Sequence, residues 1–336
     1  MFAYIVRRIL LMIPTLIGIT LLLFLMVRFA PGLTGGTAFG EGGARASKED
    51  RAKAILSYYR KLGMVDKDDH MIPVHRQYVT WLWNACRLDF GESVKYNTRV
   101  ADLIRDKIPV TLTMNLIEAC VVYFIAIPGG MLAAAKRGKR FDLFWGVGTI
   151  ALFSIPVIWS GNMVIYFLAN PQHLAWFPSG QIHDLNAATF TPWHYAADYF
   201  WHLVLPVFIM CLGGFAYLSK MMRANILDNL NQDYVRTARA KGLPPRRVFL
   251  HHVFRNSLLP LITIFAATVP GLLGGSLIIE SIFSIPGMGQ LALTATLSRD
   301  LPVLQAITFV GAIVSLICLL LQDICYAMAD PRLSYD

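Results

Sequence analysis

The chain has 336 residues, of which 56% are hydrophobic and 15% are charged, and its mean hydropathy is +0.52. This composition lies outside the range of soluble globular domains and predicts an integral membrane protein. A formal net charge of +9 fits basic residues that orient membrane spans better than a nucleic-acid partner. We therefore expect no nucleic acid to bind.

The first predicted element is a membrane span near the start of the chain. The apolar run from about Ile9 to Val27 follows Arg7 and Arg8, as in a signal peptide. It is too long for a typical signal-peptide core and has no cleavage-type exit, so we expect a retained first span. The five cysteines show neither the spacing of a disulfide framework nor that of a zinc site.

Further apolar runs of about 20 residues, the length that crosses a bilayer as a helix, recur along the chain. The six predicted spans are roughly Ile9 to Phe29, Val110 to Ala135, Leu143 to Leu168, His202 to Met221, Leu258 to Ile282 and Leu304 to Met328. The sequence therefore predicts an all-α integral membrane protein with six transmembrane helices.

Basic residues gather on one side of these spans. They precede the first span at Arg7 and Arg8, fill the tight loop 136–140 and crowd the segment 220–255. Because cytoplasmic loops carry an excess of Lys and Arg, both the N- and the C-terminus are predicted to be cytoplasmic.

The long segment 31–107 is then placed on the outer face, where its nearly balanced charge adds little to the orientation. Apolar residues at helical spacing over 52–62 and 75–88 predict a small extracytoplasmic helical elaboration over the outer mouth. The alternative is an amphipathic segment that lies on the membrane surface and is held by Trp81 and Trp83.

Two other outer segments complete the predicted organisation. Residues 170–201 mix aromatic residues and proline, which is typical of interfacial anchoring, and residues 283–302 are expected to contain a short helix after Pro286-Gly287. The predicted parts of the chain are a first transmembrane helix at 1–30, an extracytoplasmic cap at 31–107, a five-helix core at 108–330 with a cytoplasmic loop at 222–257, and a cytoplasmic tail at 331–336.

Two acidic residues lie within predicted spans, where an ionisable group costs roughly 2.5 to 3.5 kcal/mol at the helix centre. Glu118 is one helical turn from Asn115, so the two share a face. Glu280 lies near the outer end of the fifth span. Two interpretations remain open: these residues line a solute pathway or bind a cationic group, or they are structural residues bonded to neighbouring helices.

Sequence motifs give no support to catalysis by this chain. There is no G-x-x-x-x-G-K-[ST] phosphate loop and no G-x-S-x-G nucleophile turn. The adjacent His251 and His252 would point about 100° apart on a helix, so they cannot face one zinc ion. We expect no catalytic residue, no metal site and no cofactor bound by the chain itself.

The basic loop that begins at Asp233 has the pattern of a short helix with a defined end. Asn231 or Asp233 is expected to cap its start, the helix covers about two turns from Tyr234 to Lys241, and Gly242 supplies a left-handed stop. Pro244-Pro245 then prevents continuation. Two interpretations are again open, a docking surface for a cytoplasmic partner and an ordinary basic loop near anionic lipid.

The residues of this loop resemble a known family. The run TARAKG followed by RRVFLHHVFRNSLLP is similar to the EAA-type coupling loop of permease subunits of binding-protein-dependent ABC importers, in the dipeptide and oligopeptide permease family. Further matches occur in the expected order: YIVRRILLMIPTLIGIT with FAPG, LDFGES followed by IPVTLTMNL, WHLVLPV, ESIFSIPGMG, SRDLPV and the terminal DPR. Within the family the chain looks most like the inner-membrane peptide permease subtype associated with microcin C uptake.

This resemblance implies an ABC importer type I permease fold, a multi-pass location in the cell inner (cytoplasmic) membrane, and a short helix that docks in a groove on an ATPase subunit. The usual Glu-Ala-Ala is replaced by Arg236-Thr237-Ala238, so the glutamate is missing and the side chain that makes the polar docking contact is left open. We expect it to be Arg236 or Arg239. The implied ATPase-coupling residues are Asp233, Tyr234, Arg236, Thr237, Ala238, Arg239, Gly242 and Leu243.

The resemblance also implies partners. They are a second homologous permease subunit, two ATP-binding subunits that hold ATP and Mg, an extracytoplasmic solute-binding protein and membrane lipid. The expected solutes are di- or oligopeptides or peptide-like compounds, and the alternatives are glutathione, a nickel chelate or an oligosaccharide. A secondary transporter that uses Glu118 as a proton or cation site is a separate hypothesis.

Overall fold

The computed structural model of the chain describes residues 2–29, 53, 56–57, 59–60, 63–66 and 68–329. Within these residues the regular structure is helical, with two isolated β-bridges and no strand. The chain divides into two compact units. The first comprises Met1–Lys107, Leu291–Leu320 and Ser334–Asp336, and the second comprises Ile108–Gln290 and Leu321–Leu333.

The first unit is built around α1 (Phe2–Phe29), α3 (Val74–Cys86) and most of α15 (Leu301–Ala329). An aromatic cluster joins them, because Phe24 of α1 contacts Tyr78 and Trp81 of α3, and Trp81 meets Phe309 of α15 edge to face. The helix expected within 75–88 is therefore confirmed. Most of the expected helix at 52–62 and all of the tail at 331–336 lie outside the described residues.

A buried carboxylate ties α15 to the segment that follows α3. Asp300 is 1% exposed, and it accepts hydrogen bonds from the Ser93 hydroxyl and from the backbone N–H groups of Val94 and Lys95. Three donors offset the cost of burying the negative charge. This acid therefore has a structural role in the first unit.

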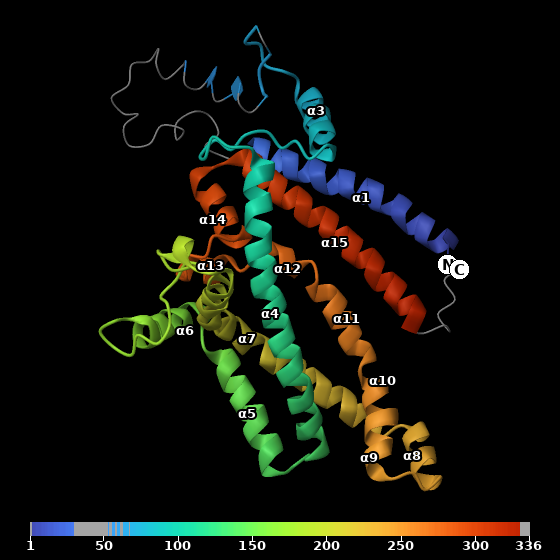
Figure 1. Ribbon diagram of the computed structural model, residues 1–336. Coiled ribbons are helices and arrows are strands. Elements are labelled where there is room, and N and C mark those ends of the chain that lie inside the picture. Colours follow the sequence, from blue (N-terminus) through green and yellow to red (C-terminus); the bar gives the residue numbers. More distant parts are fainter. Residues whose placement is uncertain are drawn as a thin grey trace. The chain divides into compact units, whose positions relative to one another are not determined.

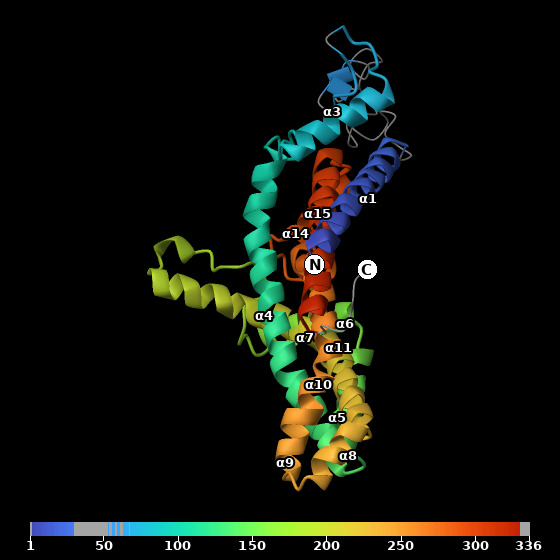
Figure 2. The same cartoon turned by 90° about the vertical axis from the view of Figure 1, so that its right-hand side faces the viewer.

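The second unit begins in α4 (Val100–Ala135), which crosses the boundary between the units. Its other helices are α5 (Arg140–Ser154), α6 (Val157–Val164), the π-helix η2 (Ile165–Ala169), the 3₁₀-helix η3 (Ala187–Thr189), α7 (Pro192–Leu230), α8 (Asp233–Ala240), α9 (Pro245–Arg247), the π-helix η4 (Val248–Phe254), α10 (Arg255–Ser257), α11 (Leu259–Thr268), α12 (Gly271–Gly274) and α13 (Leu277–Ile282). α8 lies beside α9 in both views of the molecule (Figures 1 and 2). α14 (Met288–Ser298) begins in this unit and ends in the first, and it confirms the short helix expected after Pro286-Gly287.

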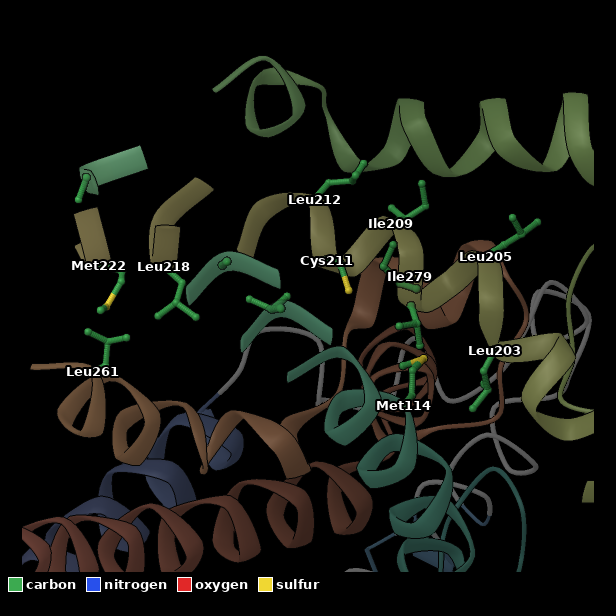
Figure 3. Packing of buried hydrophobic residues seen from close by; sticks show 14 of the residues in the cluster. Met114, Leu203, Leu205, Ile209, Cys211, Leu212, Leu218, Met222, Leu261 and Ile279 are labelled. Atoms are coloured by element: carbon green, nitrogen blue, oxygen red, sulfur yellow. The ribbon is translucent and has the colours of Figure 1, made fainter. Parts of the chain in front are cut away.

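α7 is the central helix of the second unit, since 61% of the residues in its most apolar 18-residue stretch are buried. Figure 3 shows its side chains packed with Met114 of α4, Leu261 of α11 and Ile279 of α13. Glycines allow the closest approaches. A Cβ at Gly129 would lie 1.9 Å from the Trp145 ring of α5, and a Cβ at Gly130 would lie 2.5 Å from a carbonyl oxygen of α7.

Four described helices are long and apolar enough to cross a membrane: Val6–Met26, Val100–Ala135, Pro192–Leu230 and Leu301–Asp323. They overlap the first, second, fourth and sixth predicted spans. The third predicted span is a pair of helices, Arg140–Ser154 and Val157–Ala169, with a bend of 90° between them, and it supplies a fifth crossing if the pair crosses as one.

The fifth predicted span, Leu258 to Ile282, is wrong as a single continuous helix. The structure divides it into α11, α12 and α13. Pro270 lacks the N–H that a continuing helix needs, and Gly275 has a φ of +71°, in the left-handed region that favours glycine. The count of six spans therefore stays a prediction.

Candidate functional site

The basic loop contains the predicted short helix. α8 covers Asp233–Ala240, two turns in length. The expected N-cap is wrong, because the capping position is Gln232, without a side-chain hydrogen bond, and Asp233 is the first helical residue. Asn231 does not cap α8, because it ends α7, where its side-chain amide donates to the Leu227 carbonyl at 3.1 Å.

The end of α8 has the geometry that the sequence predicted. Gly242 has a φ of +75°. Its N–H donates to the Arg239 carbonyl at 2.9 Å, and the N–H of Leu243 reaches back to the Ala238 carbonyl at 3.4 Å. These two bonds form a Schellman motif, which satisfies carbonyls that the helix end would otherwise leave open. The left-handed stop at Gly242 is thus confirmed.

One face of α8 is anchored in the core of the second unit. Val235 is 0% exposed and Ala238 is 5% exposed, and both belong to the apolar cluster that includes Ile226 of α7 with Val248 and Val253 of η4. Val248 and Val253 are five residues apart, which places them on one side of a π-helix. The small side chain of Ala238 allows α8 to lie close to this surface.

A chain of polar contacts adds a second anchor. The Tyr234 hydroxyl donates to the Asn229 side-chain oxygen at 2.5 Å. The Asn229 amide donates to the Asn225 carbonyl at 2.8 Å and to the Ser257 hydroxyl at 3.1 Å, and that hydroxyl donates to the Val253 carbonyl at 2.8 Å. Sequence reasoning missed Asn229 and Ser257. The available signal was the pair of asparagines one helical turn apart at the end of an apolar helix.

The opposite face of α8 is open. Arg236 and Asp233 have side chains 74% and 93% exposed, and their atoms Nη1 and Oδ1 are 3.3 Å apart. An exposed pair of this kind contributes little to stability. Arg239 is also exposed, whereas the Thr237 hydroxyl donates to the Asp233 carbonyl at 3.0 Å. The exposed face therefore presents two guanidinium groups, those of Arg236 and Arg239.

A second group of predicted residues lines a cavity of about 190 Å³ within the second unit. Asn115 and Glu118 of α4 both line it, so the prediction that they share a face is confirmed. Tyr123 of α4 and Tyr217 of α7 are also in the lining. The Asn115 amide donates to the Leu272 carbonyl at 2.7 Å, which fixes its orientation.

Glu280 lies elsewhere in the second unit and does not line this cavity. It is 0% exposed, and it accepts hydrogen bonds from the Thr111 hydroxyl at 3.0 Å and from the Gln290 N–H at 2.8 Å. The same Thr111 oxygen accepts the Met288 N–H at 2.8 Å. A Cβ at Gly287 would lie 2.5 Å from the carboxylate. These contacts favour the structural interpretation of Glu280.

An ion pair fixes α5 to α7. Arg223 donates to Asp142 through Nε at 2.6 Å and Nη2 at 2.8 Å, and the Gly138 N–H donates to the same carboxylate at 3.0 Å. This bidentate geometry is the strong form of such a contact.

Among the residues that the structure describes, no group of three or more His, Cys, Asp or Glu side chains is placed to hold a metal ion.

At least four helices able to cross a membrane, with a short basic helix anchored beside the end of α7, define a polytopic helical membrane protein. Residues 126–335 match the family described as "Binding-protein-dependent transport system inner membrane component". The oligopeptide transport system permease protein AppB of Bacillus subtilis (strain 168) is 38% identical and aligns over 100% of both chains.

Two further relatives align over nearly their whole length. The inner membrane ABC transporter permease protein YejB of Escherichia coli O157:H7 is 34% identical, over 99% of this chain and 99% of its own. The peptidoglycan transport system permease protein YejB of Agrobacterium fabrum is 34% identical, over 99% of this chain and 98% of its own. The chain therefore belongs to the binding-protein-dependent transport system inner membrane components. It is an inner-membrane permease subunit of an ABC transporter, as the motifs predicted.

Proposed function

We propose that the chain carries peptides or peptide-like compounds into the cell as one of two permease subunits of an ATP-driven importer. An extracytoplasmic binding protein delivers the solute, and two ATP-binding subunits hold ATP and Mg and supply the energy. The name of AppB, an oligopeptide permease aligned over 100% of both chains, supports the peptide class. Glutathione, nickel chelates and oligosaccharides remain the alternative solutes.

The single observation that carries this proposal is the construction of α8. One face is fixed by Val235 and Ala238, its start is bonded through Tyr234, and its end is set by Gly242. A loop that only connected two spans would need none of these features. An exposed basic face on an anchored helix is instead suited to receive a push from an acidic groove, with Arg236 and Arg239 as its polar contacts.

The anchors of α8 also define a route for the push. The apolar contacts reach α7 and η4, and the polar chain from Tyr234 through Asn229 reaches Ser257 of α10. A displacement of α8 therefore moves α7 together with the continuous segment formed by η4 and α10. In this proposal both termini are cytoplasmic, six spans cross the membrane, and the cap at 31–107 meets the binding protein.

The proposal is tested by cross-linking together with transport. In a variant without the native cysteines, Arg236→Cys is expected to cross-link to an ATPase subunit, whereas Leu185→Cys, 90% exposed in the loop before α7, is not. Vesicles that contain all subunits should take up labelled peptide only with hydrolysable ATP. Uptake by this chain without any ATPase subunit would refute the coupling and support a secondary transporter instead.

A further inference from the structure

Glu118 differs from three other acids of low exposure, because its carboxylate has no hydrogen-bond or ion-pair partner in the part of the chain that the structure describes. Asp300 accepts three hydrogen bonds and Glu280 at least two, and Asp142 is paired with Arg223. Among the described residues, nothing donates a hydrogen bond to the Glu118 carboxylate or pairs with it. A structural acid in a membrane helix would be bonded as the others are.

The surroundings of Glu118 leave room beside its carboxylate. Its side chain is half-buried and faces the cavity of about 190 Å³. Opposite lies Gly214 of α7, where a Cβ would meet Glu118 Oε1 at 3.3 Å and Val122 at 2.9 Å. Any larger residue at 214 would therefore reduce this space. The carboxylate borders a cavity that the packing keeps open.

The cavity lining has the chemistry of a cation site. Asn115 uses its amide nitrogen on the Leu272 carbonyl, and its side-chain oxygen is an acceptor on a second residue that lines the cavity. Tyr123 and Tyr217 add aromatic rings, which attract cations. No Lys, Arg or His is among the lining residues. One carboxylate, one amide oxygen and two aromatic rings suit an ammonium group.

The size of the cavity limits what part of a solute it holds. Pockets that enclose a whole drug-sized ligand are roughly 300 to 1,000 Å³, so about 190 Å³ accommodates one end of a peptide and not the whole molecule. We propose that the Asn115–Glu118 cavity receives the ammonium group at the amino terminus of the transported solute. This inference rests on the proposed function, which it extends by a specificity-determining residue.

The test compares two peptides that differ only in the amino terminus, one free and one acetylated, each at a concentration that saturates the binding protein. ATP-dependent uptake of both is measured in vesicles with the wild-type transporter and with Glu118→Gln, which keeps the shape and removes the charge. We expect the preference for the free amino terminus to fall roughly 10-fold or more. Glu118→Asp, which keeps the charge, should retain part of it.

The other outcomes each overturn the inference in a recognisable way. An unchanged preference in Glu118→Gln would show that the carboxylate does not meet the amino terminus. Equal loss of uptake for both peptides, with less assembled complex on a sizing column, would show that Glu118 forms an ion pair with a basic side chain of the second permease subunit and does not bind the solute. Absence of ATP-dependent uptake in the wild type would refute the proposed function itself, and the inference with it.

Discussion

Replacing Gly242 by alanine isolates the role of the turn that ends α8. The residue has a φ of +75°, and a Cβ built there has no atom within 4 Å. Alanine therefore causes no clash, and its whole effect comes from the backbone conformation. We expect Gly242→Ala to weaken the docking of α8 on the ATPase and to reduce the solute transported per ATP hydrolysed.

The magnitude follows from two opposing contributions. A left-handed conformation costs an L-residue about 1–2 kcal/mol, and losing the flexibility of glycine in the unfolded chain returns about 0.4–1 kcal/mol. The net cost is about 1 kcal/mol. Free α8 relieves the strain by fraying at its end, but docked α8 cannot, so its affinity for the ATPase should fall about fivefold. Gly242→Val should cost more, because a β-branched residue fits this conformation poorly.

Gly138 provides a matched control in the loop between α4 and α5. Its φ is +74°, and a Cβ there also has no atom within 4 Å. Gly138→Ala should therefore lower the melting temperature of the purified complex as much as Gly242→Ala does. We expect only Gly242→Ala to reduce the affinity for the ATPase subunits, measured by titration in detergent or nanodiscs.

Two results would refute this reasoning. If Gly138→Ala and Gly242→Ala lower the affinity for the ATPase subunits equally, the effect is general destabilisation and α8 is not the coupling element. If Gly242→Ala transports with the wild-type ratio of solute to ATP, the direction set by the Schellman motif is irrelevant to coupling.

Two further predictions concern stability, each measured as the free energy of unfolding of the purified chain. Asp142→Asn breaks the bidentate contact with Arg223 and should cost about 1–3 kcal/mol. The control is Asp69→Asn, which breaks the exposed pair with Arg60, whose side chain is 56% exposed and that of Asp69 38%, and it should cost under about 1 kcal/mol. Equal losses in the two variants would contradict the role of the Asp142–Arg223 pair in fixing α5 to α7. Thr111→Val leaves the buried Glu280 short of a donor and should cost about 2–4 kcal/mol, so a loss below about 1 kcal/mol would show that this contact is dispensable.

Local rules in the sequence predicted α8 well. A two-turn helix ends where Gly242 permits a left-handed residue and where Pro244-Pro245 forbids continuation, and these constraints act over a few residues. The same kind of reasoning placed Asn115 and Glu118 on one face. It failed for Asn231, because the end of α7 competes for the same side chain.

Contacts between residues far apart in the sequence could not be predicted in this way. Glu280 and Asp300 are both acids in apolar surroundings, and each accepts a hydrogen bond from a hydroxyl far away in the sequence, Thr111 at 169 residues and Ser93 at 207 residues. Hydropathy alone also counted Leu258 to Ile282 as one span, because an apolar run does not report the break at Gly275. Only the folded structure distinguishes acids whose carboxylates accept hydrogen bonds, such as Glu280 and Asp300, from an acid such as Glu118, whose carboxylate accepts none from the described residues.

The two proposed sites are linked through α7. Tyr217 of α7 lines the cavity at Glu118, and Asn229, about three turns later on the same helix, receives the bond from Tyr234 of α8. A helix transmits displacement along its axis because its backbone hydrogen bonds resist stretching. A push that shifts α7 at Asn229 therefore also moves the cavity wall at Tyr217. In the proposed mechanism, this shared helix connects the force on α8 to the release of the solute's amino terminus.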